Sequence, residues 1–156
     1  MTSNNQWPIF FEPKDDGFKA FMSVEGLLSG NSDPALVLVE AADIYAMFVS
    51  RMRSVVKEIQ QARAARILVP ARTIWSLGDL IFELSEKLGS KSLQLDDLYL
   101  HLGRDLGVKR KWLEKVIIFR RYLPAAEAIP ESLNWGRCEK GTRRVAEGLA
   151  QGIPLE

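Results

Sequence analysis

YLHLGRDLGVKRKWLEKVII, residues 99–118, has the pattern of two short helices joined by a tight turn. The apolar side chains that would pack these helices against each other are Leu102, Leu106, Val108, Leu113 and Val116. Gly103 falls where the two helices approach each other. Gly107 falls in the turn, where the chain leaves the first helix through a left-handed conformation that glycine adopts at little cost. The stretch is therefore typical of a helix-turn-helix.

The second helix of this pattern begins with cations. Lys109, Arg110 and Lys111 come first, and Lys115, Arg120 and Arg121 follow. In DNA-binding helix-turn-helix proteins, the start of the second helix enters the major groove and meets phosphates and base edges. The pattern favours binding of nucleic acid, double-stranded DNA before RNA. A second interpretation stays open, in which the stretch is an ordinary hairpin of a helical bundle and its basic side chains form a solvated face.

The expected contacts with nucleic acid come from this stretch and from a cluster of basic residues nearer the C-terminus. They are Lys109, Arg110, Lys111, Glu114, Lys115, Arg120, Arg121, Arg143 and Arg144. Arginine and lysine neutralise phosphates, whereas Glu114 either accepts a hydrogen bond from cytosine N4 or only spaces the charges.

The charge of the chain is distributed unevenly, although its net value is only +1 over 156 residues. Residues 1–50 carry a net charge of −5, and residues 51–156 carry +6. A polyanion would meet the second part. We therefore expect two regions: residues 1–50, an acidic and apolar arm with the start of a long helix, which contact a second copy or another protein, and residues 51–156, a basic helical domain that binds nucleic acid.

Apolar residues recur at helical spacing along most of the chain. The expected helices cover residues 18–28, a run of about 30 residues that begins at Pro34 and ends before Pro70, and residues 71–88, 94–106, 109–122 and 137–150. Proline suits the first position of a helix, and Asn31, Ser32 and Asp33 would cap it. No alternation typical of strands is found. The sequence predicts an all-α, multi-helix bundle that contains a helix-turn-helix and forms a homodimer or binds a protein partner through its N-terminal half.

Residue types that carry catalytic chemistry are scarce. There is one histidine and one cysteine, and no phosphate-binding loop, C-x-x-C, H-E-x-x-H or G-x-S-x-G motif occurs. We therefore expect no enzyme, no catalytic residues, no cofactor and no metal site. The single cysteine fits a reducing compartment, and no run of 18 apolar residues is present. The expected location is the cytoplasm, without a membrane segment.

Three stretches of the chain, from about residue 51 to 137 and just beyond, are similar to a known family. They are IQQARAARILVPARTIWSLGDLIFE with Trp75 and Gly78, LGRDLGVKRKWLEKVIIFRRYLP, and IPESLNWGRCEKG with Pro130 and Trp135. Together they resemble the helical N-terminal domain that precedes a PD-(D/E)XK-type nuclease domain in a bacterial family of unknown function. Trp112 and Leu113 stand where that family usually has Asn-Leu, and no nuclease domain follows in this chain. The resemblance implies recognition of nucleic acid without cleavage.

A different class of function is also consistent with the sequence. The chain would then be a helical adaptor, or a small subunit of a larger nucleoprotein complex such as a defence or mobile-element complex. Its basic face would touch nucleic acid held by other chains, or an acidic protein surface. Binding of duplex DNA by the isolated chain separates the two interpretations.

Overall fold

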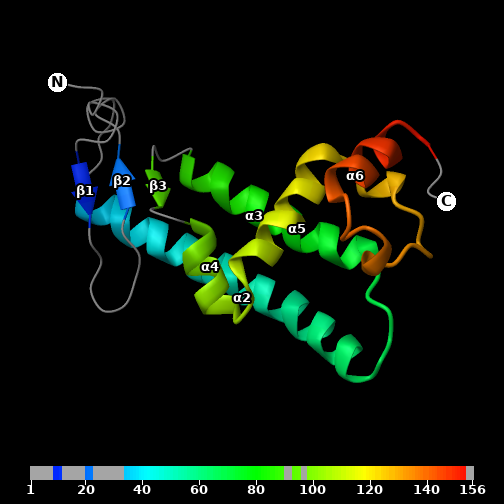
Figure 1. Cartoon of the computed structure of the whole chain (residues 1–156). Coiled ribbons are helices and arrows are strands. Elements are labelled where there is room, and N and C mark those ends of the chain that lie inside the picture. Colours follow the sequence, from blue (N-terminus) through cyan, green and yellow to red (C-terminus); the bar gives the residue numbers. More distant parts are fainter. Residues whose placement is uncertain (1–8, 12–19, 23–33, 90–92, 96–97, 154–156) are drawn as a thin grey trace.

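The protein is an all-α, multi-helix bundle, as the sequence predicts (Figure 1). The computed structural model describes residues 9–11, 20–22, 34–89, 93–95 and 98–153. The α-helices are α2 (Pro34–Ala64), α3 (Ala71–Gly89), α4 (Leu98–Leu106), α5 (Arg110–Tyr122) and α6 (Thr142–Ala150). Two 3₁₀ turns, η2 (Ala126–Ala128) and η3 (Trp135–Arg137), lie between α5 and α6.

Helix α2 is the long helix expected from the sequence, with 31 residues beginning at Pro34. The residues expected to cap it, 31–33, lie outside the described part of the chain. Its buried side chains follow one another at steps of three and four residues and pack on α3, which runs back along α2 (Figure 1). They include Tyr45, Phe48, Met52, Val56 and Ile59.

The end of α2 is closed by a backbone turn at Arg66. The Ile67 N–H donates to the carbonyl of Ala62 at 2.8 Å, and Arg66 takes a positive φ of 60°. Glycine usually occupies this position because a side chain there crowds the backbone. This turn ends the helix at Ala64, before Pro70, which was its expected limit.

Replacing Arg66 by glycine should stabilise the protein. The left-handed conformation costs a residue with a side chain roughly 1–2 kcal/mol, and the loss of glycine's greater freedom in the unfolded chain offsets part of that gain. We expect the free energy of unfolding to rise by about 0.5–1 kcal/mol in urea titrations. An Arg66→Ala variant, which keeps a Cβ, is the control and should show no such gain.

Helix α3 packs against both α2 and α5, so it lies at the centre of the bundle. It lies close to α5 at Gly78, where a Cβ would lie 2.8 Å from the Cβ of Arg120 and 3.0 Å from the carbonyl oxygen of Val116. A side chain at position 78 would push the two helices apart. The glycine therefore sets how closely α5 sits on the core.

A small antiparallel sheet corrects two of the helix predictions. Strands β1 (Ile9–Phe11), β2 (Ala20–Met22) and β3 (Leu93–Leu95) pair in that order at one end of the bundle (Figure 1). Residues 20–22 and 94–95 were expected in helices. The register pairs Ala20 with Leu95, far along the chain, so hydrogen bonds from distant segments override the local helical spacing. The remainder of helix 18–28 lies outside the described residues.

The segment between α5 and α6 is irregular and is built around Trp135. This side chain is 2% exposed and meets Phe119 edge-on, with ring centroids 5.3 Å apart. The backbone N–H of Trp135 donates to the carbonyl of Val69 at 2.7 Å, which ties the segment to the start of α3. Helix α6 begins at Thr142 and not at residue 137, because Gly141 takes a φ of 68° just before it.

Candidate nucleic-acid interface

Helices α4 and α5 are joined by a short turn at residues 107–109. Gly107 takes a φ of 70°, and a Cβ on Gly103 would lie 2.9 Å from the carbonyl oxygen of Val108. The Val108 N–H donates to the carbonyl of Gly103 at 3.0 Å. Leu102, Leu106, Leu113 and Val116 are buried, and Val108 is half-buried against the core. The glycine roles and the apolar packing predicted for this stretch are confirmed, although α4 begins at Leu98 and not at residue 94.

The C-terminal end of α4 is fixed to α2 by Asp105. The hydroxyl of Tyr45 donates to Asp105 Oδ2 at 2.6 Å, and Arg53 Nε donates to the Asp105 carbonyl at 3.1 Å. Arg104 donates to the Asp105 carboxylate at 3.0 Å. Burial would raise the pKa of Asp105, but these hydrogen bonds and the neighbouring arginines outweigh it and lower that pKa. Burial and the bond to Asp105 raise the pKa of Tyr45 above its usual range. The position of the α4–α5 turn thus depends on α2.

An Asp105→Asn variant should lose stability in a pH-dependent way. Because the folded state lowers the pKa of Asp105, the carboxylate contributes stability above its unfolded pKa and loses it as the pH falls through the folded pKa. We expect the variant to cost about 1–3 kcal/mol at pH 7. The difference from wild type should shrink below about pH 4, where the unfolded carboxyl is protonated. Urea unfolding at several pH values measures this, and a difference independent of pH would contradict the assignment.

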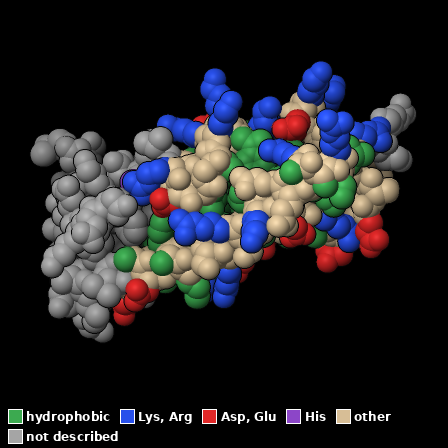
Figure 2. Space-filling view, turned by 90° about the horizontal axis from the view of Figure 1, so that it is seen from below, with side chains coloured by type: hydrophobic (Ala, Val, Ile, Leu, Met, Phe, Trp, Pro, Cys, Tyr) green, Lys and Arg blue, Asp and Glu red, His purple; other side chains and the backbone are tan. Residues whose placement is uncertain are grey.

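The side of α5 that faces away from the core is basic. Its exposed residues are Arg110, Lys111, Glu114, Lys115 and Arg121, with Ile118 and Tyr122 half-buried among them. Arg110 pairs with Glu114 at 3.4 Å. Lys109 is exposed at the N-cap of the helix. Figure 2 shows many lysine and arginine side chains along one long edge of the molecule and others across the middle of this face, with several acidic side chains along the opposite edge.

Helix α6 packs on α5 and extends this basic side. The guanidinium of Arg143 lies 4.7 Å from the ring centroid of Tyr122, at the end of α5, and also pairs with Glu147 at 3.4 Å. Arg144 is exposed on the same helix. The structure therefore brings Arg143 of α6 to the end of α5. We call Lys109, Arg110, Lys111, Lys115, Arg121, Arg143 and Arg144 the basic face.

Arg120 lies apart from the basic face, although it was expected to contact nucleic acid. Its side chain is 17% exposed, and its Nε donates to Asp79 Oδ1 at 2.9 Å. Its guanidinium also lies 4.4 Å from the Phe82 ring centroid and 5.1 Å from that of Trp75. It joins α3 to α5 instead of pointing to solvent. The local sequence does not distinguish Arg120 from its neighbour Arg121, because Asp79, the partner of Arg120, is 41 positions away.

The single cysteine of the chain, Cys138, is buried. Burial raises the pKa of the Cys138 thiol to about 11, so this cysteine stays protonated near neutral pH. Its sulfur lies 3.6 Å from the Asn134 carbonyl. No group of three or more histidine, cysteine or acidic side chains in the described ranges is arranged to hold a metal ion. None of the described helices is both long and apolar enough to span a membrane.

The protein is an all-α bundle in which a short turn joins α4 to α5, and its exposed cations on α5 and α6 form the basic face. Comparisons with protein-family models, curated proteins and solved structures give no match to the chain. The resemblance to the helical domain that precedes a nuclease domain therefore stays a prediction.

Proposed function

We propose that this chain is a non-catalytic DNA-binding protein that places α5 in the major groove. The observation that carries the proposal is the basic face itself, which combines the exposed cations of α5 with those of α6, where Arg143 lies against Tyr122 at the end of α5. Phosphate contacts by such side chains supply most of the affinity of nucleic-acid-binding proteins. Glu114 is the one acidic residue of α5, and its pairing with Arg110 leaves the face positive.

The shape of α5 favours duplex DNA over duplex RNA. The helix has 13 residues, which corresponds to a length of about 20 Å. Its outward side is exposed from Arg110 to Arg121. The major groove of B-DNA admits an α-helix of this kind, whereas that of A-form RNA is too deep and narrow.

Binding as a homodimer, or with a protein partner, completes the proposal. Two copies related by a two-fold axis would present their α5 helices to half-sites about 34 Å apart. The first half of α2 supports a contact of this kind, because Met47 is 43% exposed on it and the surrounding sequence is apolar and acidic. Sedimentation equilibrium at micromolar concentration tests this, and a strictly monomeric chain in the presence and absence of DNA would contradict homodimer formation.

Titration of the protein into labelled DNA at two salt concentrations tests the main proposal. The probes are a random-sequence duplex and one of its single strands, followed by fluorescence anisotropy. We expect the duplex to bind. The logarithm of its affinity should fall linearly with the logarithm of the salt concentration, with a slope of about 0.9 per phosphate neutralised. Absence of duplex binding at low salt would overturn the proposal.

A helical adaptor in a larger nucleoprotein complex is the second candidate. The loop between α2 and α3 favours it, because Ile67 is 62% exposed and Leu68 is 72% exposed there. Adjacent exposed apolar side chains of this size are typical of protein contacts. In this case the isolated chain would not bind duplex DNA, but an Ile67→Ser, Leu68→Ser double variant would lose association with the complex.

A further inference from the structure

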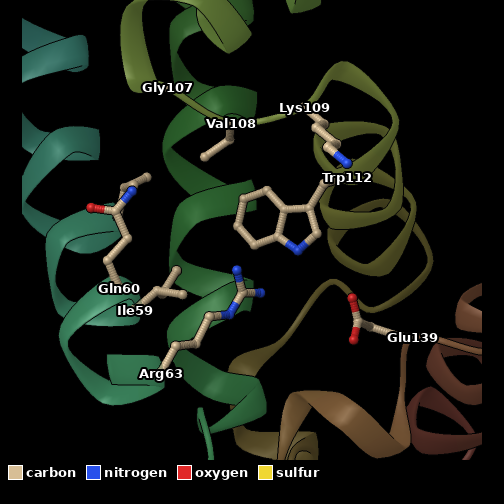
Figure 3. A pocket seen from close by; sticks show the side chains of 9 residues that line it. Ile59, Gln60, Arg63, Gly107, Val108, Lys109, Trp112 and Glu139 are labelled. Atoms are coloured by element: carbon tan, nitrogen blue, oxygen red, sulfur yellow. The ribbon is translucent and has the colours of Figure 1, made fainter. Parts of the chain in front are cut away.

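A cavity of about 630 Å³ lies between the second half of α2 and the start of α5 (Figure 3). This volume is typical of sites for small ligands. Apolar side chains of Val56, Ile59 and Val108 form part of its wall. The polar and aromatic groups come from three separate parts of the chain, namely Gln60 and Arg63 of α2, Lys109 and Trp112 at the start of α5, and Glu139 before α6.

The indole of Trp112 is the central group of this cavity. The guanidinium of Arg63 lies over its face, 5.6 Å from the ring centroid. The Trp112 Nε1 is buried and has no hydrogen-bond partner among the described residues. In Figure 3 this nitrogen edge faces the side on which Arg63 and Glu139 lie. An unsatisfied buried donor is costly, so a movement of Arg63 that lets a ligand acceptor reach this nitrogen would be favourable.

A planar ring would fit between Arg63 and Trp112 once the Arg63 side chain has moved outward. Two van der Waals spacings of about 3.5 Å require a separation of about 7 Å between the guanidinium and the indole. Arg63 is exposed and its side chain is flexible. Its guanidinium can therefore move outward from its present distance of 5.6 Å to the Trp112 ring centroid until the ring has room. The ring would then be stacked on the indole and covered by the guanidinium.

An anionic group on that ring would meet positive charge at the start of α5. Lys109 is exposed there as the N-cap residue, and no side chain caps the first N–H groups of the helix. These N–H groups and the positive end of the helix dipole attract anions. Glu139 would accept from an N–H donor on the ring. The cavity therefore offers complementary groups to both ends of an aromatic anion.

We propose that this cavity binds a small planar aromatic anion that carries a ring N–H or amino group. Aromatic carboxylates and nucleoside monophosphates share this chemistry, so the test includes both. The proposal goes beyond DNA binding and does not depend on it, because ligand binding to the isolated chain is measured without nucleic acid.

Isothermal titration calorimetry of the full chain with indole-3-acetate and with deoxyadenosine monophosphate tests the site. We expect at least one of the two to bind with a Kd of about 1 mM or tighter, and the one that binds identifies the source of the anion. Their uncharged counterparts, tryptophol and deoxyadenosine, should bind at least about tenfold more weakly. Acetate and inorganic phosphate, which lack the ring, should not bind measurably. Failure of both aromatic anions to bind at 10 mM, about ten times that Kd, would overturn the proposal.

Two pairs of variants place the binding in this cavity. Gln60→Trp fills the cavity from an exposed position and should abolish binding, whereas Gln61→Trp, on the next exposed residue outside it, should leave binding unchanged. Arg63→Ala should weaken binding about tenfold, and Arg66→Ala should not. Circular dichroism confirms that each variant is folded. Equal binding by all four variants would overturn the assignment to this cavity.

Discussion

Replacing Lys111, Lys115 and Arg121 together by alanine is expected to weaken duplex DNA binding by a factor on the order of 10 to 100 at physiological salt. All three side chains are exposed on the outward side of α5, and none of them lines the cavity beside Trp112. Loss of three phosphate contacts should also lower the slope of log affinity against log salt by about 2.7. Fluorescence anisotropy at several salt concentrations measures both quantities.

A second triple variant controls for the change in net charge. Arg51, Lys57 and Arg66 are exposed on α2 or just after it, outside the basic face, and their replacement by alanine removes the same charge. Both variants should keep the helix content of the wild type, because none of the six side chains is buried. Equal loss of affinity in the two variants would show that attraction is general and that α5 is not the binding surface.

The largest effect on stability is expected at Trp135. Truncation to alanine removes the largest fully buried side chain and its edge-on contact with Phe119, and it leaves a cavity in the core. We expect a loss of about 3–5 kcal/mol in the free energy of unfolding, measured in urea. The segment from η3 to α6 should loosen first, since Trp135 holds it to the core. Hydrogen exchange of the α6 amides reports that loosening directly.

A Trp135→Phe variant separates packing from hydrogen bonding. The indole Nε1 of Trp135 has no hydrogen-bond partner among the described residues, so its loss leaves no acceptor unsatisfied. Phenylalanine keeps an aromatic ring against Phe119, and we expect a cost of only about 1–2 kcal/mol. A cost equal to that of Trp135→Ala would mean that the indole nitrogen contributes to stability, and not only the packing of the ring.

Most of the helical framework follows from local sequence. Pro34 begins α2, helical spacing of apolar residues gives α3 and α5, and Gly107 supplies the turn between α4 and α5. Each of these signals acts within a few residues, through sterics of the backbone or the period of one helix face, and a single sequence carries such signals directly. The same locality explains the failures. Helical spacing at residues 20–22 and 94–95 was overridden by strand pairing between distant segments.

The candidate interface was predictable in part for the same reason. Exposed lysines of α5 stand at positions that one helix face fixes, so the sequence could group Lys111 with Lys115. Whether a cation points to solvent depends on its neighbours in space. Arg120 pairs with Asp79 of α3, whereas Arg121, the next residue, is exposed.

The sequence by itself determined the all-α class, the long helix, the turn at Gly107 and the positive charge of α5, because each depends on interactions between near neighbours in the chain. Only the tertiary structure decided that Asp105 fixes α4 to Tyr45 of α2, that Arg120 belongs to the α3–α5 contact, and that Arg63 lies over Trp112 beside a cavity. The hydrogen bond of Arg120 joins residues 41 positions apart, and that of Tyr45 joins residues 60 positions apart. Such residues are brought together by the packing of the helices, which no local sequence pattern predicts.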